Sequence, residues 1–355
     1  MNHVQHQNSG PHHCGKNLTP LKGIIQLVYK GASPASPATL DKPGASGYDR
    51  RQVTGEKPMI IETLDLTFQG LPQTIAAYLV HGPAGYVLVE TGPRTTLPNL
   101  LTALAARGLT SSDIRHVLVT HIHLDHAGCA GWWAQQGAQV YVHHVGAPHL
   151  IDPRRLLTSA ARIYGDQMDV LWGEVVPAPA GQVTSVYDGD QINAGGLTFT
   201  ALDTPGHAWH HHTYRLGNVA FTGDAAGVRL PDSNWLSVPA PPPEFKLDVW
   251  QKTLARLQAE AFDTLYLTHF GPVHNPRRHL EDLRQALLAT TDFIHRAMLA
   301  GASRDEILAQ YLAWNRQIAS AHHVSEAEFQ EYEAANPLFM SVDGMMRYWQ
   351  KQMAA

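Results

Sequence analysis

The pattern of apolar and polar positions divides this chain into three parts. Residues 1–56 are rich in Gly, Pro, Ser, Asn and Ala and show no sustained apolar periodicity. Such a segment buries too little apolar surface to offset the entropy of ordering it, so the sequence predicts a mobile, low-complexity N-terminal arm. A folded core is predicted over residues 57–275 and a helical C-terminal extension over residues 276–355.

Within the core, short β-prone runs alternate with helical patterns. Leucines 97, 100, 101 and 104 have the spacing of an amphipathic helix over residues 95–107. Further helices are predicted at 128–136, 153–172 and 247–260. Strands are predicted at 59–68, 74–80, 86–90, 114–120, 140–143, 183–187, 197–202, 213–216, 219–222 and 264–268. This alternation predicts an α/β protein with helices packed on sheets.

The C-terminal part reads as helical to its end, with breaks near residues 301–303 and 336–337. Its last segment contains large apolar side chains that we expect to pack as core rather than to form a substrate lid or a dimer contact: Met340, Met345, Met346, Tyr348 and Trp349. A homodimer is an open alternative to a monomer.

Composition narrows the class of protein. The chain has 355 residues, a formal net charge of −5, 44% hydrophobic residues and 16% charged residues, so we expect a globular protein without a nucleic-acid partner. Its two cysteines, Cys14 and Cys129, cannot form a disulfide framework, which favours a reducing compartment. No apolar run reaches about 18 residues and no signal-peptide pattern opens the sequence. We therefore expect a cytoplasmic protein without a membrane partner.

Metal-binding side chains follow four of the apolar runs. The first group is His121-x-His123-x-Asp125-His126, directly after the run at 117–120. Three later runs end in His207, Asp224 and His269. Imidazole nitrogens and carboxylate oxygens are ligands that zinc prefers, at about 2.0–2.2 Å. The recurrence of such residues at the ends of predicted strands favours a metal site over a solvated histidine-rich loop.

These motifs, in this order, resemble those of the metallo-β-lactamase superfamily over about residues 59–275. The resemblance implies a four-layer αββα sandwich, here with a C-terminal helical extension. It implies two Zn²⁺ ions, with iron or manganese as alternatives. One ion would be held by His121, His123 and His207, the other by Asp125, His126 and His269, and Asp224 would bridge them.

The resemblance also implies a reaction. Two ions can share a hydroxide whose parent water has a pKa lowered to about 7, and Asp125 would orient that nucleophile or accept its proton. The glyoxalase II and lactonase branches share this ligand set, so we expect hydrolysis of a small thioester, lactone or related ester. The alternative is an oxidoreductase like the mononuclear iron persulfide dioxygenases. A phosphodiesterase ranks lower because of the net charge, and a β-lactamase because of Asp224 and the absent export signal.

Several other residues qualify this expectation. Glu90 stands where the superfamily usually has aspartate in an Asp-x-Gly support beside the metals. His211 is interpreted as a packing residue beside the ligands, as in the glyoxalase II-like branch. Gly227 stands where lactonases often have a tyrosine, for which Tyr164 is the candidate replacement. The remaining candidates are anion-binding arginines and histidines expected in the core or on the surface: Arg229, Arg277, Arg278, His143, His144, His149 and His274.

Overall fold

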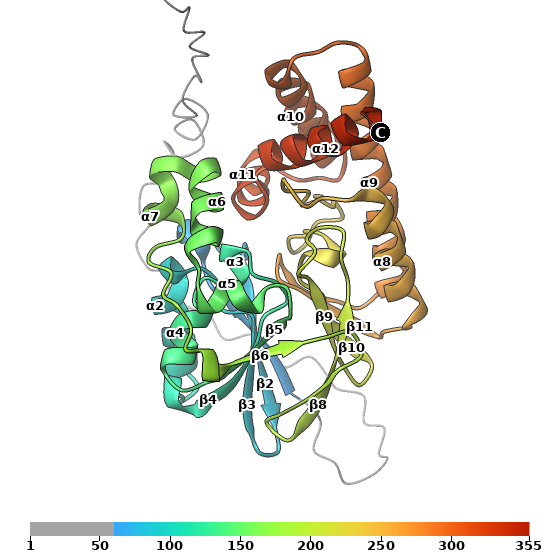
Figure 1. The fold of residues 1–355 in the computed structure, drawn as a ribbon. Coiled ribbons are helices and arrows are strands. Elements are labelled where there is room, and N and C mark those ends of the chain that lie inside the picture. The colour runs from blue at the N-terminus through green and yellow to red at the C-terminus, as the bar shows by residue number, and fades with distance from the viewer. Residues whose placement is uncertain (1–59, 355) are drawn as a thin grey trace, which may run out of the picture. The chain divides into compact units, whose positions relative to one another are not determined.

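Two six-stranded β-sheets form the centre of the protein in a computed structural model that describes residues 60–354 (Figure 1). The first sheet contains, in spatial order, β1 (Ile60–Asp65), β2 (Ala76–Gly82), β3 (Gly85–Val89), β4 (Ile114–Leu118), β5 (Gln139–His143) and β6 (Val183–Val186). The second contains, in reverse spatial order, β7 (Gln191–Ala194), β8 (Leu197–Asp203), β9 (His212–Leu216), β10 (Val219–Phe221), β11 (Thr264–Leu267) and β12 (Gly271–Val273).

Both sheets are mixed. In the first sheet β1 to β3 pair antiparallel, whereas β3 to β6 pair parallel. In the second sheet every pair is antiparallel except β10 with β11. Since the ends of parallel neighbours lie at the same edge of a sheet, this pairing brings the segments after β4, β10 and β11 to sheet edges where they can meet.

The core explains why so many strand positions are apolar. On β2, Tyr78 and Val80 pack with Phe199 and Phe221 of the other sheet, while the alternate residue Leu79 packs with the helices. Successive side chains of a strand point to opposite faces, so both faces of the first sheet are covered. Each large side chain buried in this way stabilises the fold by about 1.5–3 kcal/mol.

Helices cover the outer faces of the two sheets (Figure 1). On the first sheet lie α2 (Leu97–Ala105), α3 (Leu124–Ala127), α4 (Ala130–Gln135), α5 (Ala147–Ile151), α6 (Arg154–Tyr164) and α7 (Met168–Leu171). On the second lie α8 (Leu247–Ala259) and α9 (Pro276–Leu299). The predicted αββα sandwich is therefore confirmed, and no helix within residues 60–354 is both long and apolar enough to cross a membrane.

The C-terminal part continues with α10 (Arg304–Ala321), α11 (Glu326–Ala335) and α12 (Leu338–Met353). The predicted breaks near residues 301–303 and 336–337 are present. The core contains Met345, Met346, Tyr348 and Trp349 of α12 as expected, whereas Met340 contacts Tyr164 of α6. The prediction missed the break between α10 and α11, although Ser325 and Glu328 form a capping box there. It also missed the short strands β7 and β12. The predicted N-terminal arm and Cys14 lie outside the described residues.

The C-terminal helices hold the segment of residues 228–245, which connects the second sheet to α8. The Tyr332 hydroxyl donates to the carbonyl of Trp235 (2.8 Å) and accepts the N–H of Leu230 (3.0 Å). The Ser341 hydroxyl donates to Val238 O (2.8 Å) and accepts the N–H of Ala240 (3.2 Å). These side-chain bonds satisfy backbone groups of an irregular, buried segment, which would otherwise cost free energy.

Gly344 of α12 allows this close approach. A Cβ at position 344 would lie 1.9 Å from the carbonyl oxygen of Ala240. We expect Gly344→Ala to lower the free energy of unfolding by about 1–3 kcal/mol, because the helix and the segment must separate. Thermal unfolding measures this effect. Gly301→Ala is not a suitable control because Gly301 has φ +79°, whereas Gly181 has open space and ordinary φ. Gly181→Ala should leave stability nearly unchanged, and an equal loss in both variants would contradict the packing argument.

Candidate metal centre

The seven predicted ligands come from five segments that meet at one edge of the sandwich. His121 and His123 follow β4, and Asp125 and His126 lie on the short helix α3. The other three residues follow β8, β10 and β11 and are His207, Asp224 and His269. Two sets of three residues have ligand atoms that all lie within 4.8 Å of one another: the first group is His121, His123 and His207, and the second group is Asp125, His126 and His269. A third such set, His121, His126 and Asp224, overlaps both groups. Residues far apart in sequence thus share one site, although metal ligation itself stays a prediction.

The first group consists of three imidazoles. Nε2 of His121 and Nε2 of His207 each lie 2.9 Å from Nδ1 of His123. On its other side, His207 donates from Nδ1 to the carbonyl of Pro239 (2.8 Å), and His121 Nδ1 lies 3.1 Å from the Thr120 hydroxyl oxygen. These contacts place the protons on Nδ1 and leave Nε2 lone pairs facing the centre, the tautomer that a metal requires.

Burial keeps these three imidazoles neutral. It lowers the pKa of His121 well below its usual value, lowers that of His207, and lowers that of His123 to about 3, with neighbouring histidines adding to the effect at His121 and His123. Neutral imidazole is the ligating form. With both Nε2 atoms 2.9 Å from Nδ1 of His123, neutral rings can place at most one proton among these three nitrogens, so lone pairs face one another. A cation between the nitrogens would relieve this repulsion.

The second group combines a carboxylate with two imidazoles. Asp125 Oδ2 lies 3.6 Å from His126 Nε2 and 3.4 Å from His269 Nε2. His269 donates from Nδ1 to the carbonyl of Thr74 (2.7 Å), so its Nε2 also faces inward unprotonated when the ring is neutral. Burial alone would lower the pKa of His126, but Asp125, Asp224 and Glu90 together raise it well above its usual value. A proton and a metal cation would therefore compete for this position.

Asp224 lies between the two groups. Its Oδ2 is 3.3 Å from His207 Nε2, while its Oδ1 is 3.3 Å from His126 Nε2 and 3.6 Å from His269 Nε2. Burial opposes its charge, yet the imidazoles of His126 and His207 hold its pKa well below the usual value. One carboxylate oxygen thus faces each group, which is the arrangement a bridging ligand needs.

Three buried atoms show that this centre fits metal ions. His126 Nε2, His269 Nε2 and Asp224 Oδ1 have no hydrogen-bond partner among the described residues. Leaving such polar atoms buried and unpaired costs about 1–3 kcal/mol each, and more for charged groups. All three face the second group, so a cation held by Asp125, His126, His269 and Asp224 would satisfy them together. Zinc, iron and manganese all accept such a set of nitrogen and oxygen ligands.

Glu90 connects the two groups from behind. This carboxylate is 1% exposed and accepts hydrogen bonds from Nδ1 of His126 (3.1 Å) and from the hydroxyls of Thr120 (2.5 Å) and Thr268 (3.1 Å). Through Thr120 it also reaches His121. The sequence-based expectation of a support beside the metals is borne out by these contacts, and the longer glutamate spans to three segments.

His211 has the role expected for it, whereas His210 was missed. His211 is buried beside His121 and hydrogen-bonds through Nδ1 to the Thr204 hydroxyl (2.8 Å), outside the ligand groups. His210 is also buried, its ring centroid 5.4 Å from that of His123, and its Nε2 lies 3.3 Å from Glu244. His210 stands in a run of three histidines, and nothing in the sequence distinguishes it from the other two as a neighbour of the ligands.

A further group of possible ligands lies outside the centre. Asp203 Oδ1 is 2.6 Å from His212 Nε2 and 3.2 Å from His143 Nε2. His143 was expected to be a core or surface residue without a partner of this kind. Its Nδ1 accepts the N–H of Val145 (3.1 Å), so the neutral ring carries its proton on Nε2 and donates it to Asp203. This group is therefore a hydrogen-bonded link between β5 and the second sheet, and not a metal site.

Three other candidates have side-chain partners outside the ligand groups. The Tyr164 hydroxyl donates to the sulfur of Met340 (3.1 Å). Arg229 donates to the carbonyl of Ser233 (2.9 Å), and Arg278 pairs with Asp282 on the same helix. A side chain at Gly227 would collide with Leu283, since its Cβ would lie 2.7 Å from Leu283 Cδ1. None of these residues supplies the carbonyl-binding hydroxyl that the lactonase branch would need.

A two-sheet sandwich with paired histidine and aspartate groups at its strand ends defines a class of metal-dependent hydrolases. Residues 71–269 match the model of the metallo-beta-lactamase superfamily. The chain belongs to this superfamily.

Known relatives agree with this assignment. The chain is 24% identical over 220 residues to a metallo-beta-lactamase fold-containing protein of Sulfurisphaera tokodaii, covering 61% of this chain and 80% of that one. It is 32% identical over 125 residues to a hydroxyacylglutathione hydrolase of Aeromonas hydrophila (35% of this chain, 37% of the other). It is 27% identical over 168 residues to an atrochrysone carboxyl ACP thioesterase of Aspergillus fumigatus (46% and 31%). The chain thus spans less than half the length of the last two.

One solved structure shares the fold over most of the chain. A metallo-beta-lactamase family protein of Thermus thermophilus superposes with a TM-score of 0.61 at 24% identity, covering 83% of this chain and 94% of that one. The common region therefore extends beyond the family match at residues 71–269 into the C-terminal helices.

Proposed function

We propose that this protein is a dinuclear zinc hydrolase that cleaves a small thioester or related ester. The observation that supports it most is the position of Asp224, which has one carboxylate oxygen toward each ligand group. Bound divalent metal ions lower the pKa of water and polarise a carbonyl oxygen, which is the chemistry that ester and thioester hydrolysis needs.

The chain's own residues would orient the reactants. The side chain of Asp125 is 21% exposed, whereas those of His126, His207, Asp224 and His269 are at most 5% exposed. Its pKa is lowered to about 2, since neighbouring imidazoles outweigh its burial. It can therefore accept a hydrogen bond from a nucleophilic water as a carboxylate. Thr120 and Glu90 hold the imidazoles behind it, and buried side chains exclude bulk water from the deeper ligands.

Thioesters are favoured over lactones by two facts. Lactonases often have a tyrosine three residues beyond the bridging aspartate, and this chain has Gly227 there. A Cβ at position 227 would lie 2.7 Å from Leu283 Cδ1, and the φ of +74° also disfavours a side chain. In addition, one relative is an ACP thioesterase and another a hydroxyacylglutathione hydrolase. A complete second ligand group supports hydrolysis over the mononuclear iron dioxygenase alternative, which would use only the first group.

The purified protein tests this proposal directly. We expect about two zinc ions per chain by mass spectrometry, and hydrolysis of thioesters in a screen that also contains lactones, phosphodiesters and a β-lactam. Removal of metal by a chelator should abolish turnover, and zinc should restore it. One iron per chain with oxygen consumption on a persulfide would instead support the dioxygenase alternative and overturn the proposal.

A further inference from the structure

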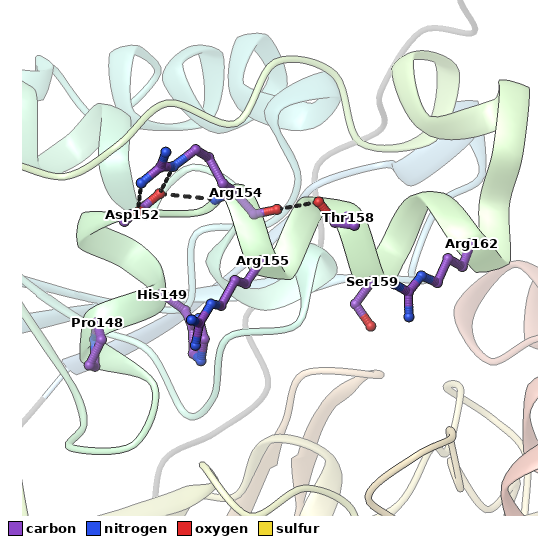
Figure 2. Close-up of a pocket in the computed structure, with 8 residues that line it drawn as sticks. All are labelled: Pro148, His149, Asp152, Arg154, Arg155, Thr158, Ser159 and Arg162. Atoms are coloured by element: carbon purple, nitrogen blue, oxygen red, sulfur yellow. Dashed lines mark hydrogen bonds and ion pairs between the residues drawn. The ribbon is translucent and has the colours of Figure 1, made fainter.

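A groove of about 670 Å³ lies on the surface of α5 and α6 (Figure 2). It is lined by basic and hydroxyl side chains, among them His149, Arg155, Ser159 and Arg162, and by the ion pair of Arg154 with Asp152. The sequence of α6 contains three arginines and no acidic residue, although the whole chain has a net charge of −5. The groove is therefore a local basic surface on an acidic protein.

Two of these arginines form no ion pair within residues 60–354, although, after the hydrogen bonds of Arg154, the charge of Arg155 also helps to lower the pKa of nearby Asp152. Arg155 and Arg162 are exposed, and neither forms a hydrogen bond or an ion pair with any residue in the described part of the chain. Residues 155, 159 and 162 recur at the helical spacing, so they share one face of α6. In Figure 2 the side chains of Arg155, Ser159 and Arg162 extend to one side of α6, with His149 of α5 beside Arg155. Arg154 extends to the other side of the helix and binds the carboxylate of Asp152, and this ion pair forms another part of the lining.

Helix α5, which forms one side of the groove, begins beside the loop that carries the candidate metal ligands. Gly146, directly before α5, packs against Ile122, and a Cβ at position 146 would lie 2.7 Å from Ile122 Cγ2. Ile122 stands between the ligands His121 and His123. At the other end of α6, Tyr164 contacts Met340 of α12. In Figure 1 α5 and α6 lie beside α3, which carries Asp125, and α6 is turned toward α11.

We infer that this groove binds the phosphate groups of the thiol part of the substrate, so that the natural thioester carries a phosphopantetheine arm. This inference rests on the proposed function. A guanidinium group can donate two parallel hydrogen bonds to phosphate oxygens, so two arginines that are not ion-paired within the described residues, together with a hydroxyl and an imidazole, suit the phosphate of such an arm. The acyl end would then extend from the groove toward the loop at Ile122.

The reaction that follows is a simple hydrolysis. The oxygen of water bonds to the acyl carbon, the carbon–sulfur bond breaks, and the products are a carboxylic acid and a thiol that takes up the proton. Such a phosphopantetheine thiol exists both in coenzyme A and on acyl carrier proteins. The phosphate contact is common to both sources, and the test separates them.

The experiment compares matched substrates. One acyl group is presented as its coenzyme A thioester, as its carrier-protein thioester and as its N-acetylcysteamine thioester, which has no phosphate. We expect Arg155→Gln/Arg162→Gln to raise KM for the phosphate-bearing thioesters about tenfold and to leave the N-acetylcysteamine thioester and the metal content unchanged. The larger of the two phosphate-dependent losses identifies the natural source. The control is Arg284→Gln/Arg296→Gln, which removes the same charge from arginines outside the groove that are already paired with Glu281 and Asp292.

The outcomes distinguish the two proposals. If Arg155→Gln/Arg162→Gln raises KM equally for thioesters with and without phosphate, or if the control variant raises KM by the same factor, the groove assignment is overturned. The proposal of thioester hydrolysis would stay intact in both cases. If the wild type cleaves no thioester, the proposed function fails, and calorimetric titration with pantetheine 4′-phosphate still tests the groove. Absence of binding, or binding unchanged in Arg155→Gln/Arg162→Gln, would overturn it. Cleavage of an oligonucleotide that depends on the same arginines would assign the groove to a phosphodiester instead.

Discussion

Asp224→Ala is expected to lose at least one metal ion and to abolish hydrolysis. The variant removes the only carboxylate that lies between the two groups of the described centre, with one oxygen near His207 and the other near His126 and His269. Without it, each remaining ligand group has less negative charge to balance a divalent cation, and the two ions lose their shared ligand. Metal content of the purified protein and kcat/KM on the best thioester from the screen measure the two effects.

Asp203→Ala is the matched control for this variant. Asp203 also accepts contacts from two histidines, His143 and His212, but it stands outside the metal centre. We expect this control to retain both metals, whatever it costs in stability. A variant at Asp224 that keeps two metals and the wild-type rate would show that the proposed centre is wrong.

Glu90→Gln is expected to weaken metal affinity or activity about 10- to 100-fold. The buried carboxylate accepts hydrogen bonds from Thr120, His126 and Thr268, whereas a glutamine amide has only one accepting oxygen. All three side-chain donors bond to Oε1, whereas Oε2 accepts only the backbone N–H of Thr120 (3.3 Å). An amide with its oxygen at the Oε1 position would therefore turn its NH₂ toward the Thr120 N–H, and His126 would lose the negative charge that supports its Nδ1 proton. Competition with a chromophoric chelator measures affinity, and a thermal unfolding curve shows that the variant is folded.

Glu62→Gln provides the comparison for Glu90. Glu62 of β1 accepts hydrogen bonds from His81 of β2 and from Arg107, which follows α2, but its side chain is 30% exposed and it belongs to none of the ligand groups. Water can replace those contacts, so metal affinity should not change. If Glu90→Gln binds metal as tightly as Glu62→Gln, then Glu90 serves stability alone.

Much of this protein is determined locally. The apolar runs predicted the strands because a sheet covered on both faces needs nearly continuous apolar sequence, and the leucine spacing predicted α2 for the same kind of reason. The ligand types at the ends of four such runs were enough to predict a metal centre, whereas the assignment of its individual ligands came from the resemblance to a known family and stays a prediction. The short strands β7 and β12 were not predicted, because three or four residues are too few to show an apolar alternation and such strands form only beside their neighbours in the sheet.

Tertiary structure alone decided how those members are held. No sequence pattern shows that Pro239 fixes the tautomer of His207, or that Ser341 of α12 holds the backbone on either side of Pro239. Only the folded chain shows that Arg154 pairs with Asp152 while Arg155 and Arg162 form no ion pair within residues 60–354. The sequence by itself determined which residues could bind metal, because that depends on side-chain chemistry. Which of them converge, and which cations stay free for a substrate, depends on distances between segments that only the folded chain sets.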